Sequence, residues 1–381
     1  MKPLPLDGIV VADFSRVLAG PLCTELLADE GARVVKVEEP RFGDETRRWG
    51  PPFAGDVSTY FLSVNRNKES IALDLRQDRE LARALIERAD VIVDNFLPAQ
   101  RRELLGEIPA EKVHCSITGF DPETAEANRP GYDLLAQAGA GLMSITGGAE
   151  PFKTGVALAD VLTAHYAHGA ILAALYAGGG ARLEVSLFGA TLASLVNVAQ
   201  AALTTGREAQ RYGNAHPSIV PYQLFHARDR AFAIGGGTDR HYRLLCERVV
   251  ERPALATDER FATNAARVTN RAILVPLLEE IFATNDAQHW VDRCRDANIP
   301  ASLVRGVLEA LRSEEAKPLL ARLDDFETVG HPVRIDGERL PVRMRPPRLG
   351  EHTEALKREL TGTPARTGAR SRGTRTPRGR R

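Results

Sequence analysis

The first forty residues alternate between a strand pattern and a helix pattern, and this order restricts the fold more than any other feature of the chain. Residues 9–14 form a short β-rich run, residues 21–28 carry apolar side chains at helical spacing, and residues 33–38 form a second β-rich run. Gly31 separates the helical pattern from the second run, as a helix stop does. The order predicts a βαβ unit with two parallel strands.

The same alternation continues over the first third of the chain. Further strands are predicted at residues 70–75, 91–94 and 113–118, and a helix at residues 78–88. Strands that alternate with helices form parallel sheets covered by helices. We therefore expect an α/β fold.

The remainder of the chain divides at changes of pattern. Residues 160–177 are apolar at nearly every turn, as in a buried helix that Gly178–Gly180 ends, and residues 188–205 predict a second long helix. The expected parts are a large domain over 1–187, a helical linker over 188–221, a smaller α+β domain over 222–305, a segment over 306–360 that returns to the large domain, and a tail over 361–381.

Composition narrows the class of protein. With 43% hydrophobic and 26% charged residues the chain is globular in character, and its longest Ala/Leu run, residues 169–176, is too short to span a bilayer. The N-terminus lacks the pattern of a signal peptide, so a cytoplasmic protein without a membrane partner is predicted. The four widely spaced cysteines predict buried apolar side chains rather than disulfides or a zinc site.

The tail differs from the rest of the chain. Residues 361–381 hold seven arginines and no acid, with little apolar content, so we expect the tail to be disordered. The body of the chain is correspondingly acidic, and nucleic acid is not an expected partner.

The βαβ unit invites comparison with dinucleotide-binding proteins, because Glu38 ends the second strand where a ribose-binding acid would lie. The connecting loop, residues 15–21, has a single glycine where three are needed. Its Pro21 also removes a backbone N–H that a pyrophosphate would use. NAD and FAD are therefore not the expected ligands.

Signatures of other chemistries are missing as well. The sequence has no GxSxG, no phosphate-binding GK[ST] loop and no HExxH. His165 and His168 share a helix face but have no third ligand nearby, so no metal is expected. Gly235, Gly236 and Gly237 follow a predicted strand, and they fit a flexible lid or an anion-binding nest as well as a tight turn.

Asp160 is the acid that stands apart on chemical grounds. It lies among small and apolar residues at the start of a strongly hydrophobic helix. An aspartate there can simply cap the helix. It can equally be a nucleophile kept ionised and poorly solvated near a helix N-terminus. The residues alone leave both interpretations open.

Seven stretches, taken together and in order over residues 6–356, resemble the class III CoA-transferases of the CaiB/BaiF type, a family that includes formyl-CoA transferases and acyl-CoA racemases. The stretches are DFSRVLAGP with LLADEGA and VKVE in residues 13–38, NRNKESIALDL in 65–75, DVIVDNF in 90–96, RPGYD in 129–133, VALAD in 156–160, GNAHPSIVPY in 213–222 and LGEHT in 349–353.

The resemblance implies a fold and a mechanism. The fold is a Rossmann-like, CoA-binding large domain with a smaller domain, in a homodimer whose two chains interlock. The implied substrates are an acyl-CoA, with coenzyme A as the carrier, and a carboxylic acid acceptor. Asp160 is the implied nucleophile, which forms an acyl-aspartyl anhydride and then an aspartyl-CoA thioester. Such a site must exclude water, because water would hydrolyse the anhydride.

The resemblance also assigns positions. Those matching CoA contacts are Val17, Ala19, Leu73, Leu75, Asn95, Phe96 and Arg102, with Arg101 as a substitute for Arg102 and with Arg41 compensating for Glu39, where the family often has arginine. Those matching the acyl pocket are Leu18, Tyr60, Tyr132, Asp133, Gly235, Gly236 and Gly237, with Trp49 expected beneath the glycine loop.

Two departures decide between members of the family. The racemases look to have a His-Asp pair where this chain has Tyr132-Asp133, and a phenol with an ordinary pKa of about 10 is a poor base near neutral pH. Transfer is therefore preferred over racemisation, and formyl or oxalate specificity is not expected because Leu18 replaces the glutamine of formyl-type enzymes. The alternatives are an α-methylacyl-CoA racemase and a CoA-binding protein without turnover, in which Asp160 is only a helix cap.

Overall fold

The computed structural model describes residues 3–362, and its contacts divide the chain into two units. The first unit comprises the residues up to Pro130, Thr163–Ser186 and the residues from Val333, and the second comprises Gly131–Leu162 and Leu187–Pro332. This division places residues 131–162 with the second unit, whereas the sequence placed them in the large domain. The domain boundaries drawn from the sequence stay a prediction.

The predicted βαβ unit is confirmed. Strand β1 (Val10–Asp13) leads into helix α1 (Ala19–Asp29), and β2 (Arg33–Glu38) runs parallel to β1 with Ala12 opposite Val35. Gly31 has a φ of 112°, which a residue with a side chain rarely adopts, so it provides the turn between helix and strand.

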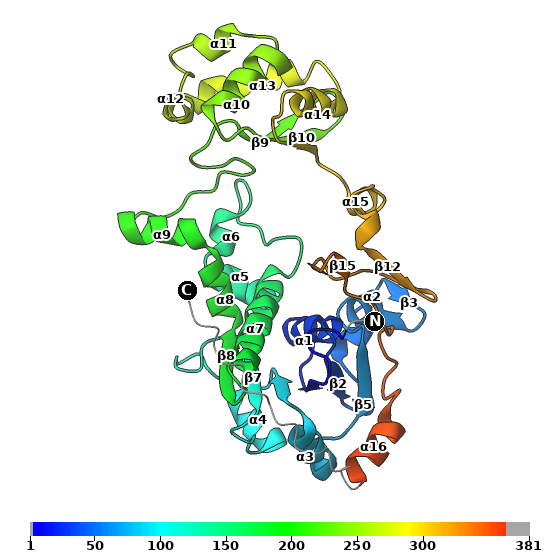
Figure 1. The fold of residues 1–381 in the computed structure, drawn as a ribbon. Coiled ribbons are helices and arrows are strands. Elements are labelled where there is room, and N and C mark those ends of the chain that lie inside the picture. The colour runs from blue at the N-terminus through cyan, green and yellow to red at the C-terminus, as the bar shows by residue number, and fades with distance from the viewer. Residues whose placement is uncertain (1–2, 363–381) are drawn as a thin grey trace, which may run out of the picture. The chain divides into compact units, whose positions relative to one another are not determined.

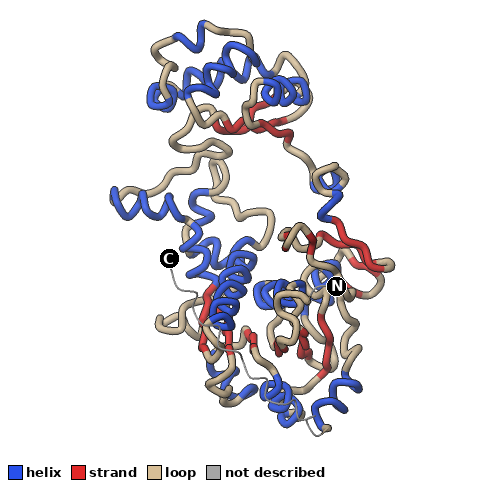
Figure 2. Tube along the Cα trace, viewed as in Figure 1, coloured by secondary structure: helices blue, strands red, loops and turns tan. Residues whose placement is uncertain are grey.

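Within residues 3–362, a parallel sheet of six strands forms the centre of the first unit, in the order β5-β2-β1-β6-β7-β8 (Figures 1 and 2). The added strands are β5 (Lys68–Ala72), β6 (Val91–Asp94), β7 (Val113–Thr118) and β8 (Ala181–Ser186). Along the chain this order reads third, second, first, fourth, fifth, sixth, which is the doubly wound order of Rossmann folds. The α/β prediction is confirmed, although β5 begins two residues before the predicted strand.

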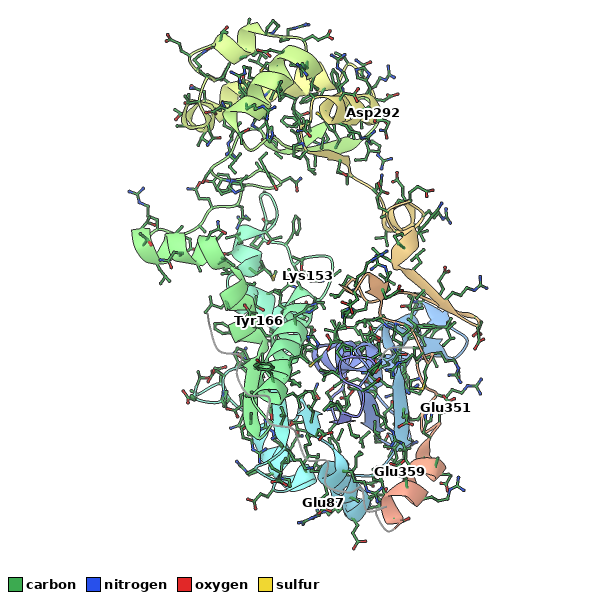
Figure 3. The ribbon with its side chains drawn as sticks, viewed as in Figure 1. Glu87, Lys153, Tyr166, Asp292, Glu351 and Glu359 are labelled. Atoms are coloured by element: carbon green, nitrogen blue, oxygen red, sulfur yellow. The ribbon has the colours of Figure 1, made fainter. Side chains whose placement is uncertain are left out.

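One face of the sheet packs an apolar core against three helices, α3 (Arg79–Arg88), α4 (Pro98–Leu105) and α16 (Thr353–Thr361). Ala12, Val35 and Ile92 lie side by side in the register and face this core. Leu356 and Leu360 of α16 close it from the C-terminal end of the described chain. Glu359 of α16 pairs with Arg33 through two bonds of 2.8 Å (Figure 3).

Short elements and the C-terminal segment complete the first unit. Asn67 donates to the carbonyl of Pro341 and accepts the backbone N–H groups of Arg343 and Met344, at 2.6–3.3 Å, so the chain after β15 contacts the residue that precedes β5. The short elements are a 3₁₀ turn at Glu45–Arg48, β3 (Phe53–Ala54), β4 (Val57–Ser58), α2 (Thr59–Leu62), β14 (Arg334–Ile335) and β15 (Glu338–Arg339). The predicted tail starts too early, because Thr361 is still helical; residues 363–381 lie outside the described residues.

Helix α7 (Leu158–Tyr176) coincides with the predicted apolar helix, but it is only partly buried, because Tyr166 and Tyr176 are exposed. Ala164, Ala167 and Ile171 are fully buried, which accounts for its apolar sequence. With 19 residues it is long and apolar enough to cross a membrane by length and composition, and so the expectation that no segment reaches that length is wrong. Because buried core helices pass the same test, this finding gives only weak evidence of a membrane span.

The predicted long helix over residues 188–205 is wrong. The chain forms two helices in the second unit, α8 (Leu187–Ser194) and α9 (Val196–Thr205), which meet at an angle of 77°. Val196 has a φ of 41° at the break. The apolar pattern continues through the break, so periodicity alone could not locate it.

The remaining elements of the second unit surround a separate apolar core. Phe225, Phe232 and Phe282 contact one another in edge-to-face or tilted arrangements within this core, which runs from Val220 to Leu303. Its elements are β9 (Tyr222–His226), β10 (Ala231–Gly235), α10 (Asp239–Leu244), a π-helical turn (Leu245–Val249), α11 (Ala254–Thr257), α12 (Asn264–Thr269), α13 (Arg271–Phe282), α14 (Ala287–Asp296) and β11 (Ala301–Leu303). The unit also contains α5 (Asp133–Gly139), α6 (Leu142–Ile145), α15 (Val307–Leu311), a 3₁₀ turn at Lys317–Leu319, β12 (Leu320–Leu323) and β13 (Phe326–Val329).

Candidate active site

The sheet order creates a site for a ligand at the carboxyl ends of the two central strands of the first unit. Strands β1 and β6 are neighbours but belong to different halves of the order, so the loops that follow them diverge at their carboxyl ends. Ligands of doubly wound sheets bind at such a switch point. The Asn95 side chain ties the two loops together, because it accepts from the backbone N–H of Arg16 at 3.1 Å and donates to the Arg16 carbonyl at 2.8 Å.

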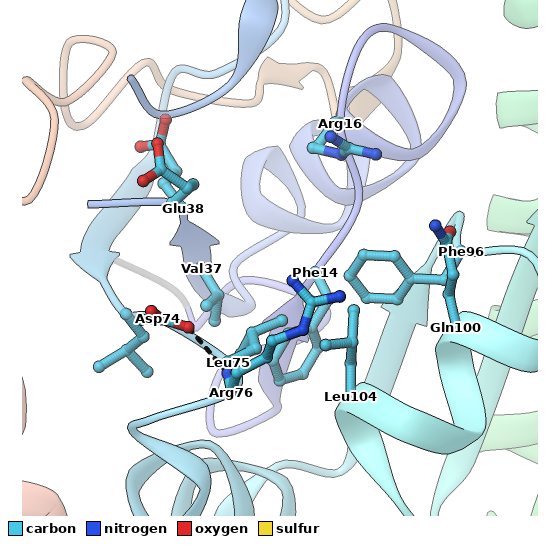
Figure 4. A pocket seen from close by; sticks show the side chains of 12 residues that line it. Phe14, Arg16, Val37, Glu38, Asp74, Leu75, Arg76, Phe96, Gln100 and Leu104 are labelled. Carbon is cyan, nitrogen blue, oxygen red and sulfur yellow. Dashed lines mark hydrogen bonds between the residues drawn. The ribbon is translucent and has the colours of Figure 1, made fainter. Parts of the chain in front are cut away.

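A cavity of about 280 Å³ opens at this switch point (Figure 4). Apolar side chains line much of it, and charged or polar groups lie among them. The lining residues are Phe14, Arg16, Val37, Glu38, Glu39, Leu73, Asp74, Leu75, Arg76, Phe96, Gln100 and Leu104. An apolar site with a few polar groups suits a flat heteroaromatic ring that carries polar or charged substituents, as a nucleotide does.

The structure brings some of the predicted CoA-binding residues to this cavity and leaves others outside it. Leu73, Leu75 and Phe96 line it. Asn95 instead fixes the adjoining loop, in which Val17 lies, and Ala19 is the first residue of α1. Arg41 lies over the ring of Phe42, at 4.6 Å from its centroid, and is not a lining residue.

Neither of the two arginines predicted to contact CoA, Arg101 and Arg102, lines the cavity. Arg101 donates to Asp94 at 3.2 Å, whereas Arg102 is exposed on α4 and is not a lining residue of the cavity. Sequence reasoning missed Arg16 and Arg76 as lining residues. A usable signal existed, since Arg16 lies in the loop after β1 and Arg76 directly follows Leu75.

Buried charges hold the loop after β1 in place. Lys36 donates to the Ser15 carbonyl at 2.9 Å and pairs with Asp44 at 2.9 Å, and Lys68 donates to the Pro21 carbonyl at 2.7 Å. Burial alone would lower the pKa of Lys36, but Asp44 and Asp13 raise it above its ordinary value. The ammonium groups therefore fix both ends of the loop.

Gly20 is required by the packing of this loop. A Cβ at Gly20 would lie 2.2 Å from both the Cβ and the Oγ of Ser15. Ser15 cannot easily yield, because its hydroxyl donates to the fully buried Asp13 at 2.5 Å. The loop after β1 can thus close on α1 only with glycine at this position.

The second unit places Asp160 in the first turn of α7. The helix begins at Leu158, so Asp160 is its third residue, and the interpretation of Asp160 as the helix cap is wrong. The capping contact comes from Asp133 at the start of α5, which accepts the backbone N–H of Ala159 at 2.9 Å. Asp160 is nearly buried and is not needed to cap the helix.

Two carboxylates therefore lie close together at the start of α7. Burial, and then the charge of Asp133, raises the pKa of Asp160 to about 7. Gln137 binds the Asp133 carboxylate through its amide nitrogen, at 3.0 and 2.8 Å from the two oxygens. A poorly solvated carboxylate that is readily ionised near neutral pH can attack an electrophilic carbonyl carbon.

The remaining predicted acyl-pocket residues fall in both units. Tyr132 immediately precedes Asp133 and is exposed, in the second unit. Tyr60 is half-buried in the first unit, with the ring of Trp49 edge-on at 5.4 Å. Leu18 is half-buried just before α1. The predicted place of Trp49 beneath the glycine loop stays a prediction.

The glycine segment is a tight turn. Gly235 ends β10 and donates to the Pro300 carbonyl at 2.8 Å, and Gly237 donates back to the Gly235 carbonyl at 2.9 Å. None of Gly235, Gly236 and Gly237 has the positive φ that an anion nest requires. The nest interpretation is therefore wrong.

Other singled-out residues have structural partners. His168 contacts Glu30 at 3.0 Å, and His165 is exposed. Within residues 3–362, no group of three metal-ligating side chains was found. Cys23, Cys115, Cys246 and Cys294 are free and buried, as predicted.

Comparison with known proteins shows the family of this chain. Residues 6–353 match CoA-transferase family III. The chain is 37% identical to the succinyl-CoA:glutarate CoA-transferase of Mus musculus, over 93% of this chain and 86% of that protein. It is 36% identical to the acetyl-CoA:oxalate CoA-transferase of Acetobacter aceti, over 95% of this chain and 97% of that protein.

A solved structure gives the same result. The crystal structure of a CaiB/BaiF family protein from Brucella suis superposes with a TM-score of 0.85 at 37% identity, covering 94% of this chain and all of that one. The chain belongs to CoA-transferase family III.

Proposed function

We propose that this protein moves CoA from an acyl-CoA thioester to a carboxylic acid, with Asp160 as the nucleophile. The observation that carries the proposal is the position of Asp160, nearly buried in the first turn of α7 beside Asp133 and not engaged as a cap. Membership of a CoA-transferase family, and relatives named CoA-transferases at 35–37% identity, support transfer of CoA between acids.

Each step of the proposed reaction exchanges one acyl bond for another. The Asp160 carboxylate attacks the thioester carbonyl, the C–S bond breaks, and a mixed anhydride and CoA thiolate form. The thiolate then attacks the Asp160 carbonyl carbon, which releases the donor acid and leaves an aspartyl-CoA thioester. The acceptor carboxylate repeats the two steps in reverse order, so that new acyl-CoA leaves and the carboxylate of Asp160 is restored.

The cavity of the first unit supplies the binding site for the nucleotide part of CoA in this proposal. Leu73, Leu75 and Phe96 provide apolar surface for the adenine ring, while Arg16 and Arg76 offer positive charge for phosphate. Binding energy gained at the nucleotide, which does not react, can favour the reacting geometry at the thioester.

Dicarboxylic acids are the proposed class of substrate. The names of similar proteins specify succinyl-CoA with glutarate, mesaconate or citramalate, and acetyl-CoA with oxalate.

We propose a cytoplasmic homodimer of interlocked chains, and the exposed Val196 and Leu203 of α9, at 69% and 81%, support an apolar interface between copies. Light scattering at several protein concentrations measures this state.

The test is mass spectrometry of the intact protein after mixing with succinyl-CoA and other acyl-CoAs, followed by trapping with hydroxylamine or borohydride. The native protein should carry an acyl or CoA adduct at Asp160, and Asp160→Ala should carry none and lose at least about 10³-fold in kcat. CoA binding, measured by calorimetry, should persist in the variant.

The alternatives predict different results. Deuterium exchange at the α-carbon without an acceptor acid, and no adduct, would show a racemase. CoA binding with neither adduct nor exchange would show a binding protein without turnover.

A further inference from the structure

Gln137 is a fully buried polar side chain whose two ends contact different parts of the site. Its amide nitrogen donates to both oxygens of Asp133 and lies 3.5 Å from the Val156 carbonyl. Its carbonyl oxygen accepts the backbone N–H of Thr154 at 3.0 Å and the Thr154 hydroxyl at 3.2 Å. One amide thereby connects α5 with the segment that leads into α7.

The contacts of Gln137 restrict what Asp133 can do. Asp133 and Gln137 are four residues apart on α5 and so share a helix face. The carboxylate of Asp133 accepts N–H groups from Gln137 and from Ala159, and these contacts together hold it in one orientation. Asp160 follows Ala159 directly, so the orientation of Asp133 is passed to the first turn of α7.

The turn that precedes Thr154 has contacts of its own, separate from those of Gln137. Arg211 donates to the carbonyls of Ser144, Gly148 and Ala149 at 2.9–3.1 Å and fixes the turn from its other side. Lys153, the cation next to Thr154, is exposed and donates to the Thr154 carbonyl at 2.9 Å (Figure 3). Among these groups, the contact of Gln137 with Asp133 is the link to the capping carboxylate of α7.

We propose that Gln137 is a positioning residue for acyl transfer, which holds Asp133 against the N-terminus of α7 and thereby fixes the approach of Asp160 to the thioester. The inference rests on the proposed function and adds a residue that acts through Asp133, without contact to the substrate.

Two substitutions separate this role from a merely structural one. Gln137→Glu keeps the length and the acceptor but loses the donor, and Gln137→Met loses both without adding charge. Both should lower kcat by about 10–100-fold, the range expected when a reacting group is misplaced, with the KM for acyl-CoA within about threefold of native. Thr154→Val is the matched control, because it removes only the contacts of the hydroxyl with the Gln137 and Val156 carbonyls and keeps the backbone N–H; its kcat should stay within about threefold of native.

The pH dependence gives the distinguishing readout. The carboxyl group introduced by Gln137→Glu can donate to Asp133 again once it is protonated. The kcat of that variant, divided by the native kcat, should therefore rise as pH falls from 8 to 5.5, while the ratio for Gln137→Met stays flat. Melting temperatures and CoA affinity of both variants show that they are folded.

The outcomes are separable from those of the proposed function. If the native protein forms no adduct at Asp160, the proposed function fails whatever the variants do. If the native protein forms the adduct and Gln137→Met keeps the native kcat, or if the two ratios depend on pH alike, the role of Gln137 is overturned.

Discussion

The cavity of the first unit and the carboxylate pair of the second unit are built in different ways. The cavity is formed where neighbouring strands of one sheet end, by side chains in β2 or within four residues of the ends of β1, β2, β5 and β6, together with α4. The pair of Asp133 and Asp160 depends on single polar contacts between segments more than twenty residues apart. Backbone topology thus creates the binding surface, whereas the chemistry depends on individual hydrogen bonds. The two regions should respond differently to mutation and to pH.

The largest difference between the two regions is expected from a charge in the cavity. Leu75→Glu buries a carboxylate where an apolar ring is proposed to bind, and should weaken CoA binding by about 10–100-fold. The kcat at saturating acyl-CoA should change little, because Asp160 is untouched. Calorimetry and steady-state kinetics measure the two quantities.

Leu81→Glu is the matched control for this substitution. Leu81 is also half-buried against the core of the first unit, but it does not line the cavity. Equal loss of CoA affinity in both variants would contradict the assignment of the cavity.

The second largest difference between the two regions is expected in the pH dependence of kcat/KM and of CoA affinity. The nucleophile must be ionised, and the pKa of Asp160 is raised to about 7, so kcat/KM should fall about tenfold for each pH unit below 7 and level off above it. Asp133→Asn removes the second cause of the shift and should move the midpoint to lower pH. CoA affinity should stay level over the same range, and a parallel fall in affinity would oppose the assignment.

The smallest expected effect is on stability. Because folding raises the pKa of Asp160 from 3.8 to about 7, ionisation of Asp160 costs the folded state free energy, which grows as pH rises from about 4 to 7 and is constant above. Asp160→Asn removes this cost. The free energy of unfolding of the variant, minus that of the native protein, should be about 2–3 kcal/mol larger at pH 8 than at pH 5. Urea unfolding at both pH values measures it, and an advantage independent of pH would show that Asp160 is not buried as described.

The sequence predicted the parts that follow from local pattern. The βαβ unit, the parallel sheet and α7 could be recognised because apolar periodicity and glycine stops mark them. Leu73, Leu75 and Phe96 were identified by resemblance, and the structure places them at the cavity. The particular role assigned to Asp160 stays a prediction.

What the sequence could not show are contacts between separate segments. Lys36 stands in an apolar strand pattern, and only the paired strands reveal that it meets Asp44 and the Ser15 carbonyl. The interpretation of Asp160 as a cap failed because the capping carboxylate belongs to α5. The break between α8 and α9 was missed because apolar residues lie on both sides of it.

The place of α16 has a consequence for the synthesis of the chain. Leu356 and Leu360 complete the core that Ala12 and Val35 begin, some 340 residues earlier in the sequence. At about 5–20 residues per second, a ribosome makes α16 roughly 20–70 s after β1. During that time the part of this core that α16 covers is exposed, so a nascent chain offers an apolar binding site for chaperones until α16 is released. Truncation before Thr353 would leave the part of the core that α16 covers permanently exposed.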